Sequence, residues 1–598
     1  MAEKNGSPPA RETKAVDVSE QRWGSDFVAD LVKGYGFEYV TYNPGASFRG
    51  IEESLINYNN NVPQTIETPH EGVSVSIAHG YAKATGEPSL CILHNVVGTL
   101  NAAMSIYNAY IDRVPIVMLS GTGPLRKSHR RPWIDWIHSA NIQGNLVRDY
   151  VKWDDQPLHS DGVAESFLRA AEISQTKPMG PTYITIDHSL QENELEEPLE
   201  LPDFSKFDPP SRMAPDSRAI EEAAAHLTDA EMPLILVDTV GDTQEAVDGL
   251  VDLAETLAAP VMDIAWRRFN FPTTHPLYFS GSDIYEKADV VLGLDVWDID
   301  RVTPDSSEKL TDAIDREFTY IEIGTHELEA SGVFPNTYPA RETDISILAD
   351  TTLANPKLAE AVRKELEDDT RAQERVANRY DLLTEENEAL RTAFQEEAEE
   401  VWDDSPISTA RLAGETWNVI QDDDWVLVNN MFPRWAEKLW EFTEFDQYIG
   451  GYGGGAGVGY GIGASIGAAL AYKGTGRIPV SLQPDGDLMQ YVNALWVLGH
   501  YDIPLMAVMH NNRQMYNSTN HRMNLAESRG RDSTHESALI GTGYRDPSPD
   551  FASIAEAMGV VGYGPVKDPA ELNKVLTAAW EDAKNGSPVL VDVVCQSE

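Results

Sequence analysis

Three residues in the last quarter of the chain, Asp485, Gly486 and Asn512, have the types and the spacing of a metal-binding site. Asp485 and Gly486 stand in the segment Gln-Pro-Asp-Gly-Asp, and Asn512 ends the segment His-Asn-Asn, 27 residues after Asp485. A carboxylate and an amide oxygen are hard ligands, which suit Mg²⁺ or Ca²⁺ and let the ion bridge to a phosphate. The pattern indicates a cation site, although an ordinary strand–helix–strand (βαβ) unit with polar turns could contain the same residues.

The flanking residues predict how these ligands are positioned. Two apolar, strand-like runs, Ile478–Leu482 and Pro504–Met509, precede Asp485 and Asn512. Between the runs, apolar side chains recur at helical spacing, which predicts a helix; they are Leu488, Tyr491, Val492, Leu495 and Leu498. In such a βαβ unit the strands are parallel, and their carboxyl ends share one edge of the sheet. We expect Asp485 and Asn512 to converge there, with the backbone carbonyl of Gln514 as a third oxygen.

A second candidate group surrounds Glu71. The segment His70-Glu71-Gly72 is followed by Ala-His-Gly-Tyr-Ala-Lys-Ala-Thr-Gly over residues 78–86. A glutamate that is partly buried can have a proton affinity suited to acid–base chemistry. The structural alternative is that Glu71 is only a favourable charge at a helix N-terminus.

A run of glycines occupies residues 450–463, which read Gly-Gly-Tyr-Gly-Gly-Gly-Ala-Gly-Val-Gly-Tyr-Gly-Ile-Gly. Glycines allow the backbone to approach a ligand closely. No Gly-Lys-Ser/Thr follows the run, so a P-loop is not indicated, and no acidic residue for a ribose follows at the interval of a dinucleotide site. The run therefore indicates a ligand-contacting loop of another kind.

Further segments complete a pattern that resembles the thiamine diphosphate (ThDP) enzymes. They are Asn43-Pro44-Gly45, Leu93-His94 after a strand-like run from Leu90, Gly180-Pro181-Thr182, and Phe-Pro-Thr-Thr-His-Pro at residues 271–276. The resemblance spans residues 22–595. It is greatest to benzoylformate decarboxylase, which has Leu-His at the position of Leu93-His94, and acetolactate synthase comes next.

The resemblance implies a cofactor and a role for each candidate residue. Glu71 would act on the pyrimidine N1′ of ThDP and so promote loss of the thiazolium C2 proton. Asp485, Asn512 and the Gln514 carbonyl would hold Mg²⁺, or Ca²⁺, against the diphosphate. Other cofactor contacts would fall on Ala456, whose carbonyl accepts from the 4′-amino group, on Val458, which supports the bent cofactor, and on Gly486 and Asp487. His94 and His275 match the two histidines that benzoylformate decarboxylase uses for proton transfer.

Three positions depart from the family pattern. Pro484 replaces the first glycine of Gly-Asp-Gly. Asp487 adds a second carboxylate close to the diphosphate, which should cost electrostatic free energy. Ala46 occupies the place of a serine that benzoylformate decarboxylase uses, and Ser47 follows it. These departures suggest a substrate other than benzoylformate.

The resemblance implies ThDP- and Mg²⁺-dependent, non-oxidative decarboxylation of a 2-oxo acid. Two alternatives stay open: a carboligase of the acetolactate synthase type, and a ThDP-binding protein without turnover. Some relatives bind FAD, but no dinucleotide fingerprint in the middle of this chain supports it. In the family, Glu71 and the diphosphate site of one active site come from different subunits, so a homodimer or homotetramer is expected. The segments Arg130–His138 and Tyr516–Arg531 lie where the family shapes its substrate pocket.

The succession of strand-like and helical segments, together with the resemblance, predicts an α/β fold with the three-domain ThDP-enzyme architecture, each domain a mostly parallel sheet flanked by helices. Predicted strands include Leu90–Leu93, Val114–Leu119, Tyr183–Ile186, Leu234–Val237, Val261–Ile264, Val290–Leu294 and Tyr320–Ile323, and a charged helical stretch covers Lys357–Glu400. The expected parts are a disordered tail (1–20), a pyrimidine-binding domain (21–195), a central Rossmann-like domain (216–355), a helical linker (356–404), and a diphosphate- and metal-binding domain (405–598).

The composition excludes several classes of protein. The 598-residue chain has 46 basic and 96 acidic residues, a net charge of −50, so it has no footprint for nucleic acid. It has no apolar run long enough for a membrane span and no signal-peptide core. Two cysteines, Cys91 and Cys595, argue against a disulfide framework. The acidic excess is spread along the chain, and salt would screen its self-repulsion. We interpret this as the composition of a cytoplasmic enzyme from a halophile.

Overall fold

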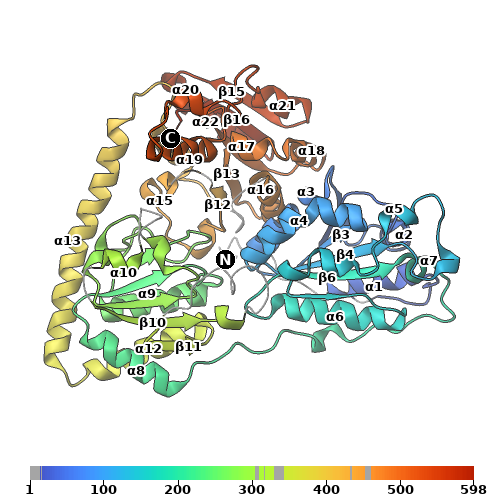
Figure 1. Cartoon of the computed structure of the whole chain (residues 1–598), viewed down its shortest axis with the longest axis horizontal. Coiled ribbons are helices and arrows are strands. Elements are labelled where there is room, and N and C mark those ends of the chain that lie inside the picture. The colour runs from blue at the N-terminus through green and yellow to red at the C-terminus, as the bar shows by residue number, and fades with distance from the viewer. Residues whose placement is uncertain are drawn as a thin grey trace. The chain divides into compact units, whose positions relative to one another are not determined.

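The chain forms three β-sheets, each parallel throughout and flanked by helices, in the computed structural model (Figure 1). The structure describes residues 14, 16–302, 309–314, 317–328, 342–430, 432, 434–451 and 459–597. Two compact units contain the sheets: one comprises residues 1–209, 401–436 and 451–598, and the other residues 210–400 and 437–450. This architecture confirms the predicted α/β fold with three parallel-sheet domains.

The first sheet has six strands in the order β2-β1-β3-β4-β6-β5. Its strands are β1 (Tyr39–Tyr42), β2 (Gln64–Glu67), β3 (Ser89–Leu93), β4 (Ile116–Thr122), β5 (Trp153–Asp155) and β6 (Thr182–Asp187). The helices are α1 (Gly24–Tyr35), α2 (Arg49–Glu53), α3 (Glu71–Thr85), α4 (Val96–Ile111), α5 (Asp135–His138), α6 (Asp161–Gln175) and α7 (His188–Glu192). The predicted strands β3, β4 and β6 are therefore present, with ends shifted by one to three residues.

The side chains of β3 point alternately to the two faces of the sheet, and helices cover both faces. Leu90 and Ile92 pack in a core with α1 and α6, whereas Cys91 and Leu93 pack in a separate core with α3 and α4. A parallel strand buried on both faces is a continuous apolar run, as β3 is. The sheet therefore fixes α3 and α4 on one face, above the strands in Figure 1, and these two helices carry Glu71 and its neighbours.

The second sheet has five strands in the order β11-β10-β9-β7-β8. They are β7 (Pro233–Val237), β8 (Val261–Asp263), β9 (Val290–Leu294), β10 (Thr319–Gly324) and β11 (Ile345–Leu348). Its helices are α8 (Ser217–Asp229), α9 (Gln244–Leu257), α10 (Leu310–Ala313), α12 (Thr351–Leu366) and α13 (Thr370–Glu400). The predicted charged stretch is thus two helices, α12 and the long α13 (yellow in Figure 1), and not one.

The third sheet has five strands in the order β12-β13-β14-β16-β15. They are β12 (Trp425–Asn430), β13 (Ile478–Pro484), β14 (Leu505–Asn511), β15 (Val561–Val566) and β16 (Pro588–Val594). The helices are α14 (Thr409–Ile420), α15 (Trp435–Leu439), α16 (Tyr460–Tyr472), α17 (Asp485–Leu488), α18 (Leu495–His500), α19 (Tyr516–Ser528), α20 (His535–Ala538), α21 (Phe551–Ala557) and α22 (Pro569–Lys584). The predicted strands β13 and β14 are adjacent and parallel.

The single helix predicted between β13 and β14 is wrong. The segment forms α17, a short 3₁₀ turn at Val492–Ala494 and α18. Tyr491 has φ −133° and ψ 43°, which lies outside the helical region and separates the pieces. Of the five periodic residues, Leu488, Leu495 and Leu498 are fully buried, whereas Tyr491 and Val492 are only partly buried. Within the described residues, no helix is both long and apolar enough to cross a membrane.

Candidate active site

The loops that carry the predicted metal ligands meet at the carboxyl ends of β13 and β14. Asp485 follows β13, and its Oδ1 accepts a hydrogen bond from the Gly486 N–H at 2.7 Å. Its Oδ2 accepts from the Arg513 N–H, on the loop after β14, at 2.5 Å. Asn512 Oδ1 accepts from the Gln514 N–H at 3.1 Å. The convergence expected from the βαβ pattern is therefore present.

The donor set at this edge fits a hard divalent cation. Asp485 is 2 % exposed, and burial raises the pKa of its carboxyl group to about 7, against the opposing effect of backbone hydrogen bonds. A cation would offset that burial penalty. The Gln514 carbonyl lies 3.7 Å from where a Cβ on Gly486 would stand, so it faces the same turn. A carboxylate, an amide oxygen and a backbone carbonyl suit Mg²⁺ or Ca²⁺.

Asp487, which departs from the family pattern, caps the N-terminus of α16. Its Oδ1 accepts from the Gly459 N–H at 2.8 Å, and its Oδ2 accepts from the Gly461 N–H at 3.0 Å. The Gln483 Nε2 also donates to Oδ2, at 2.8 Å. A carboxylate at a helix N-terminus is stabilised by the N–H groups and by the helix dipole. These hydrogen bonds therefore offset the electrostatic cost that was expected for the Asp487 carboxylate. A direct contact of Asp487 with the cofactor stays a prediction.

The positions around this cap show which glycines are required. Pro484 has φ −77°, an ordinary value for proline, so the family's first glycine is not needed for backbone conformation here. Gly459, in contrast, has φ 84° and lies so close to Tyr491 that a Cβ would stand 2.3 Å from the ring. The predicted cofactor contacts Ala456 and Val458 lie outside the described residues.

Glu71 begins α3 and is 3 % exposed. The Asn101 Nδ2, on α4, donates to Glu71 Oε2 at 3.1 Å. A Cβ on Gly98 would stand 3.0 Å from Glu71 Oε1, so this glycine leaves room for the carboxylate. His70 caps α3 by accepting from the Gly72 N–H at 3.0 Å. Glu71 is thus a buried carboxylate with one amide partner, as acid–base chemistry requires.

The Glu71 helix packs along α16 within the same compact unit. A Cβ on Gly80 of α3 would meet the Ala464 carbonyl of α16 at 1.9 Å, so only glycine allows this approach. Tyr491 joins the two sides, because its ring lies 5.0 Å from the His70 ring. Burial raises the pKa of Tyr491, and the charges of Asp487 and Glu71 raise it further. One chain therefore brings the Glu71 helix against the helix that follows the glycine run. The expected sharing of the active site between subunits stays a prediction.

His94 lies beside Glu71 and contacts Ser47, whose hydroxyl is 2.8 Å from His94 Nδ1. The Asn95 N–H donates to Nδ1 at 3.0 Å, so Nδ1 is an acceptor and a neutral ring carries its proton on Nε2. Burial lowers the pKa of His94, and the nearby charges of His138 and Arg131 lower it further. Ser47 is buried, so the hydroxyl lost at Ala46 is present one position later.

His138 is the second histidine that the structure brings to this place. The His94 and His138 rings are 5.4 Å apart and nearly perpendicular. The His138 Nδ1 is buried and has no hydrogen-bond partner among the described residues. Arg131 braces the segment: its Nη2 lies 3.0 Å from Asp135 Oδ1, and its Nη1 donates to the Ala46 carbonyl at 3.3 Å. His138 can therefore hold or move a proton beside His94.

His275 belongs to the other compact unit, where both of its ring nitrogens have partners. Nδ1 accepts from the Leu277 N–H at 3.1 Å, and Nε2 lies 3.3 Å from Glu255 Oε1. Burial lowers the pKa of His275, whereas Glu255 raises it. These contacts describe a histidine that caps a turn, and its predicted role in proton transfer stays a prediction.

Sequence reasoning missed Ser47, His138 and Asn101 as site residues. Ser47 directly follows the recognised Asn-Pro-Gly segment, and a Cβ on Gly45 would stand 2.7 Å from the His94 ring, so that turn does pack on His94. His138 stands at the end of the segment expected to shape the substrate pocket. Asn101 is 30 residues from Glu71 in the sequence, and its neighbours in the sequence do not predict that its side chain contacts Glu71.

Three domain descriptions of one family match the chain. "Thiamine pyrophosphate enzyme, N-terminal TPP binding domain" matches residues 22–146, the central domain of that family matches 220–349, and its C-terminal TPP binding domain matches 431–593. Thiamine pyrophosphate is another name for ThDP.

Individual relatives show the same likeness. The chain is 24 % identical over 594 residues to the "Probable acetolactate synthase large subunit" of Methanocaldococcus jannaschii, covering 96 % of this chain and 91 % of that protein. Its fold is similar to the ThDP-dependent 4-hydroxybenzoylformate decarboxylase of Rhodococcus jostii RHA1, with a TM-score of 0.75, 20 % identity, and coverage of 96 % and 99 %. The benzoylformate decarboxylase of Polynucleobacter necessarius gives a TM-score of 0.73 at 17 % identity, with the same coverage.

The three family matches fall in order on the three sheets. The chain belongs to the thiamine pyrophosphate enzymes.

Proposed function

We propose that the protein catalyses ThDP- and Mg²⁺-dependent, non-oxidative decarboxylation of a 2-oxo acid. The observation that carries this proposal is the cluster beside Glu71, in which Ser47 and His138 flank His94. Two histidines next to the activating glutamate provide proton transfer at the reacting carbon and its oxygen. Decarboxylation ends with such a proton transfer, so the cluster suits this outcome.

The chain's own residues would hold the cofactor and the metal ion. Asp485, Asn512 and the Gln514 carbonyl would bind Mg²⁺, and the Glu71 carboxylate would hold a proton at the pyrimidine N1′. When bound, ThDP supplies a thiazolium carbon that can add to a ketone and accept the electrons left by departing CO₂. Gly98 leaves room for the Glu71 carboxylate, and Gly72 leaves room for the Tyr491 hydroxyl, which a Cβ on Gly72 would meet at 2.1 Å.

His94 would orient the substrate by donating from Nε2–H to the carbonyl oxygen. Its Nδ1 is fixed as an acceptor by Ser47 and by the Asn95 N–H, which holds the ring in the tautomer needed. Its lowered pKa keeps the ring neutral at neutral pH. His138, beside His94, would supply the second proton, whereas the two ring nitrogens of His275 are engaged by the Leu277 N–H and by Glu255.

Carboligation is the second candidate, because the M. jannaschii relative, named as an acetolactate synthase, matches along almost the whole chain. In that case a second 2-oxo acid would take the place of the final proton. The two functions are distinguished by their products, since pyruvate would give acetolactate in one case and an aldehyde in the other.

The test is to add ThDP, Mg²⁺ and a panel of aliphatic and aromatic 2-oxo acids to the purified protein in high salt. We expect CO₂ and the matching aldehyde from at least one acid, with no acetolactate. Acetolactate from pyruvate would support carboligation instead. Bound ThDP without CO₂ from any acid would reject both functions.

We also propose that the enzyme works as a homodimer or homotetramer in the cytoplasm of a halophile. The support for the halophilic origin is the net charge of −50, which arises from acidic residues spread along the chain. The support for oligomers is the family, in which active sites form between subunits.

A further inference from the structure

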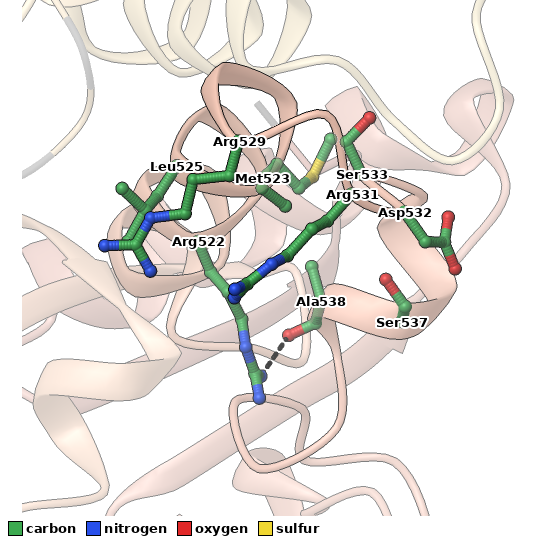
Figure 2. Close-up of a pocket in the computed structure, with 10 residues that line it drawn as sticks. Arg522, Met523, Leu525, Arg529, Arg531, Asp532, Ser533, Ser537 and Ala538 are labelled. Atoms are coloured by element: carbon green, nitrogen blue, oxygen red, sulfur yellow. Dashed lines mark hydrogen bonds between the residues drawn. The ribbon is translucent and has the colours of Figure 1, made fainter.

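A pocket with three arginines lies beyond the metal-binding loops (Figure 2). Its cavity volume is about 230 Å³, and it is formed by α19, α20 and the turn between them. The lining side chains include Arg522, Arg529, Arg531, Asp532 and Ser537. None of these residues belongs to the cluster around Glu71 and His94 or to the metal ligands.

The charge of this pocket contrasts with the rest of the chain. Acidic residues outnumber basic ones by 96 to 46, yet three guanidinium groups and one carboxylate line this cavity. In Figure 2 the guanidinium groups of the three arginines lie on one side of the view, and the Asp532 carboxylate lies on the other. Within the described residues, the side chains of Arg529 and Arg531 make no hydrogen bond or ion pair. Two exposed, unpaired guanidinium groups thus border a concave surface.

Arg522 differs, because the fold itself holds it in place. Its Nη1 donates to the Ala538 carbonyl at 2.9 Å and also to the Ile540 carbonyl. This contact ties α19 to α20 and leaves the other guanidinium N–H groups for a ligand, since arginine has five donors. Ser537 also lines the cavity, but its hydroxyl already donates to the Thr534 carbonyl at 3.0 Å. One arginine held by the fold and two arginines without partners among the described residues match the way proteins bind carboxylates and phosphates.

We propose that this pocket binds a small oxyanion, either a carboxylate or a phosphate group of a metabolite. Guanidinium groups bind carboxylates and phosphates through the same bidentate hydrogen bonds, so the structure assigns an oxyanion without choosing between the two. The Met523 and Leu525 side chains provide an apolar wall, which suits a small organic anion. The lining residues do not include Asp485, Asn512 or Gln514, and a bound anion would neutralise Arg529 and Arg531, whose side chains have no partner among the described residues.

Binding here would reach the metal loop through direct contacts. The pocket lies in the segment 516–542, which begins directly after the metal loop. Its end returns to that loop, because the Met515 N–H donates to the Thr542 carbonyl at 2.8 Å. His535, at the start of α20, places its Nε2 3.2 Å from Gln514 Oε1. Gln514 also supplies the carbonyl proposed as a metal ligand. An anion that fixes α19 against α20 would therefore also fix His535 and Gln514, and this step rests on the proposed metal site.

The test is calorimetric titration of the full-length protein, saturated with ThDP and Mg²⁺ so that phosphate cannot occupy the diphosphate site. The probes are inorganic phosphate and malonate, with uncharged malonamide as the blank. We expect one equivalent of phosphate or malonate to bind. The double variant Arg529→Gln/Arg531→Gln should bind at least tenfold more weakly. Arg545→Gln, an exposed arginine that does not line the pocket, should stay within twofold of the wild type.

The probes also separate the two sources of the anion, since binding of only one identifies the ligand as a phosphate or a carboxylate. Absence of binding by both probes, or equal binding by the double variant, would overturn the proposal. As a second readout, the bound probe should slow amide hydrogen exchange in residues 516–542 of the wild type but not of the double variant. The titration needs no turnover, so its result is independent of the proposed reaction.

Discussion

At the scale of single residues, the proposed proton transfer depends on the protonation of His94. Burial is the largest cause of its lowered pKa, and the charges of His138 and Arg131 act in the same direction. The neutral ring therefore persists to lower pH than for an ordinary histidine. If the neutral form is the active one, activity falls only when the pH drops through this lowered value.

Replacement of His138 by Gln tests this interpretation. The change removes a charge that lowers the His94 pKa, so the acidic limb of the kcat/KM profile should move to higher pH. Loss of a proton donor should also reduce kcat by about 100-fold. His129→Gln is the matched control, because His129 belongs to the same loop but contacts Ser189 instead. An unchanged pH profile together with wild-type kcat would remove His138 from the mechanism.

Sequence alone could not find the Ser47–His94–His138 cluster. Its members are 47 and 44 positions apart in the chain, and their proximity depends on how strands β1, β3 and β4 lie side by side. Glu71 and His94, in contrast, stand in recognisable local segments. The alignment of Ala46 with the family serine also hid the fact that Ser47 reaches the same histidine.

At the scale of elements, the βαβ unit from β13 to β14 was predictable because its strands are continuous apolar runs. The break at Tyr491 was not, since Leu488, Leu495 and Leu498 are buried although the helix is interrupted. The contact that fixes the break, Tyr491 against His70 and Gly72, comes from a distant segment. Local periodicity reports which residues are buried but cannot report such a contact.

Asp487 is the residue through which this unit holds α16. Asp487→Ala should destabilise the protein by about 1–2 kcal/mol, since it removes a buried carboxylate that accepts from the N–H groups at the start of α16. Asp487→Asn should cost less, because an amide oxygen can still accept one N–H. The measurement is urea unfolding of the cofactor-free protein in high salt.

Asp568→Ala provides the comparison for that experiment, because Asp568 is an exposed N-cap of α22. Its loss should cost about 0.5–1 kcal/mol, at the lower end for such caps. An Asp487→Ala variant as stable as the wild type would show that the capping contacts contribute nothing, and that Asp487 is retained for another purpose.

At the scale of the whole molecule, the net charge of −50 predicts a stability that depends on salt. Self-repulsion opposes the compact state, and at about 1 M salt the Debye length falls to roughly 3 Å, so that surface charges no longer interact at long range. The melting temperature should therefore rise steadily from low to multimolar KCl. Differential scanning calorimetry at several KCl concentrations checks this, and equal or greater stability at low salt would exclude a halophilic protein.

The proposed function requires that Glu71 activates ThDP. This claim can be measured without knowing the substrate, through exchange of the ThDP C2 proton for deuterium, followed by acid quench and NMR. The matched variants are Glu71→Gln, which keeps the size of the side chain, and Glu53→Gln, an exposed glutamate. Both should be assayed with saturating ThDP and Mg²⁺ in high salt.

We predict that the wild type and Glu53→Gln accelerate the exchange far above its rate in free ThDP. Glu71→Gln should lose this acceleration by at least about 100-fold while still binding the cofactor. Exchange in the wild type no faster than in free ThDP, or undiminished exchange in Glu71→Gln, would contradict the account.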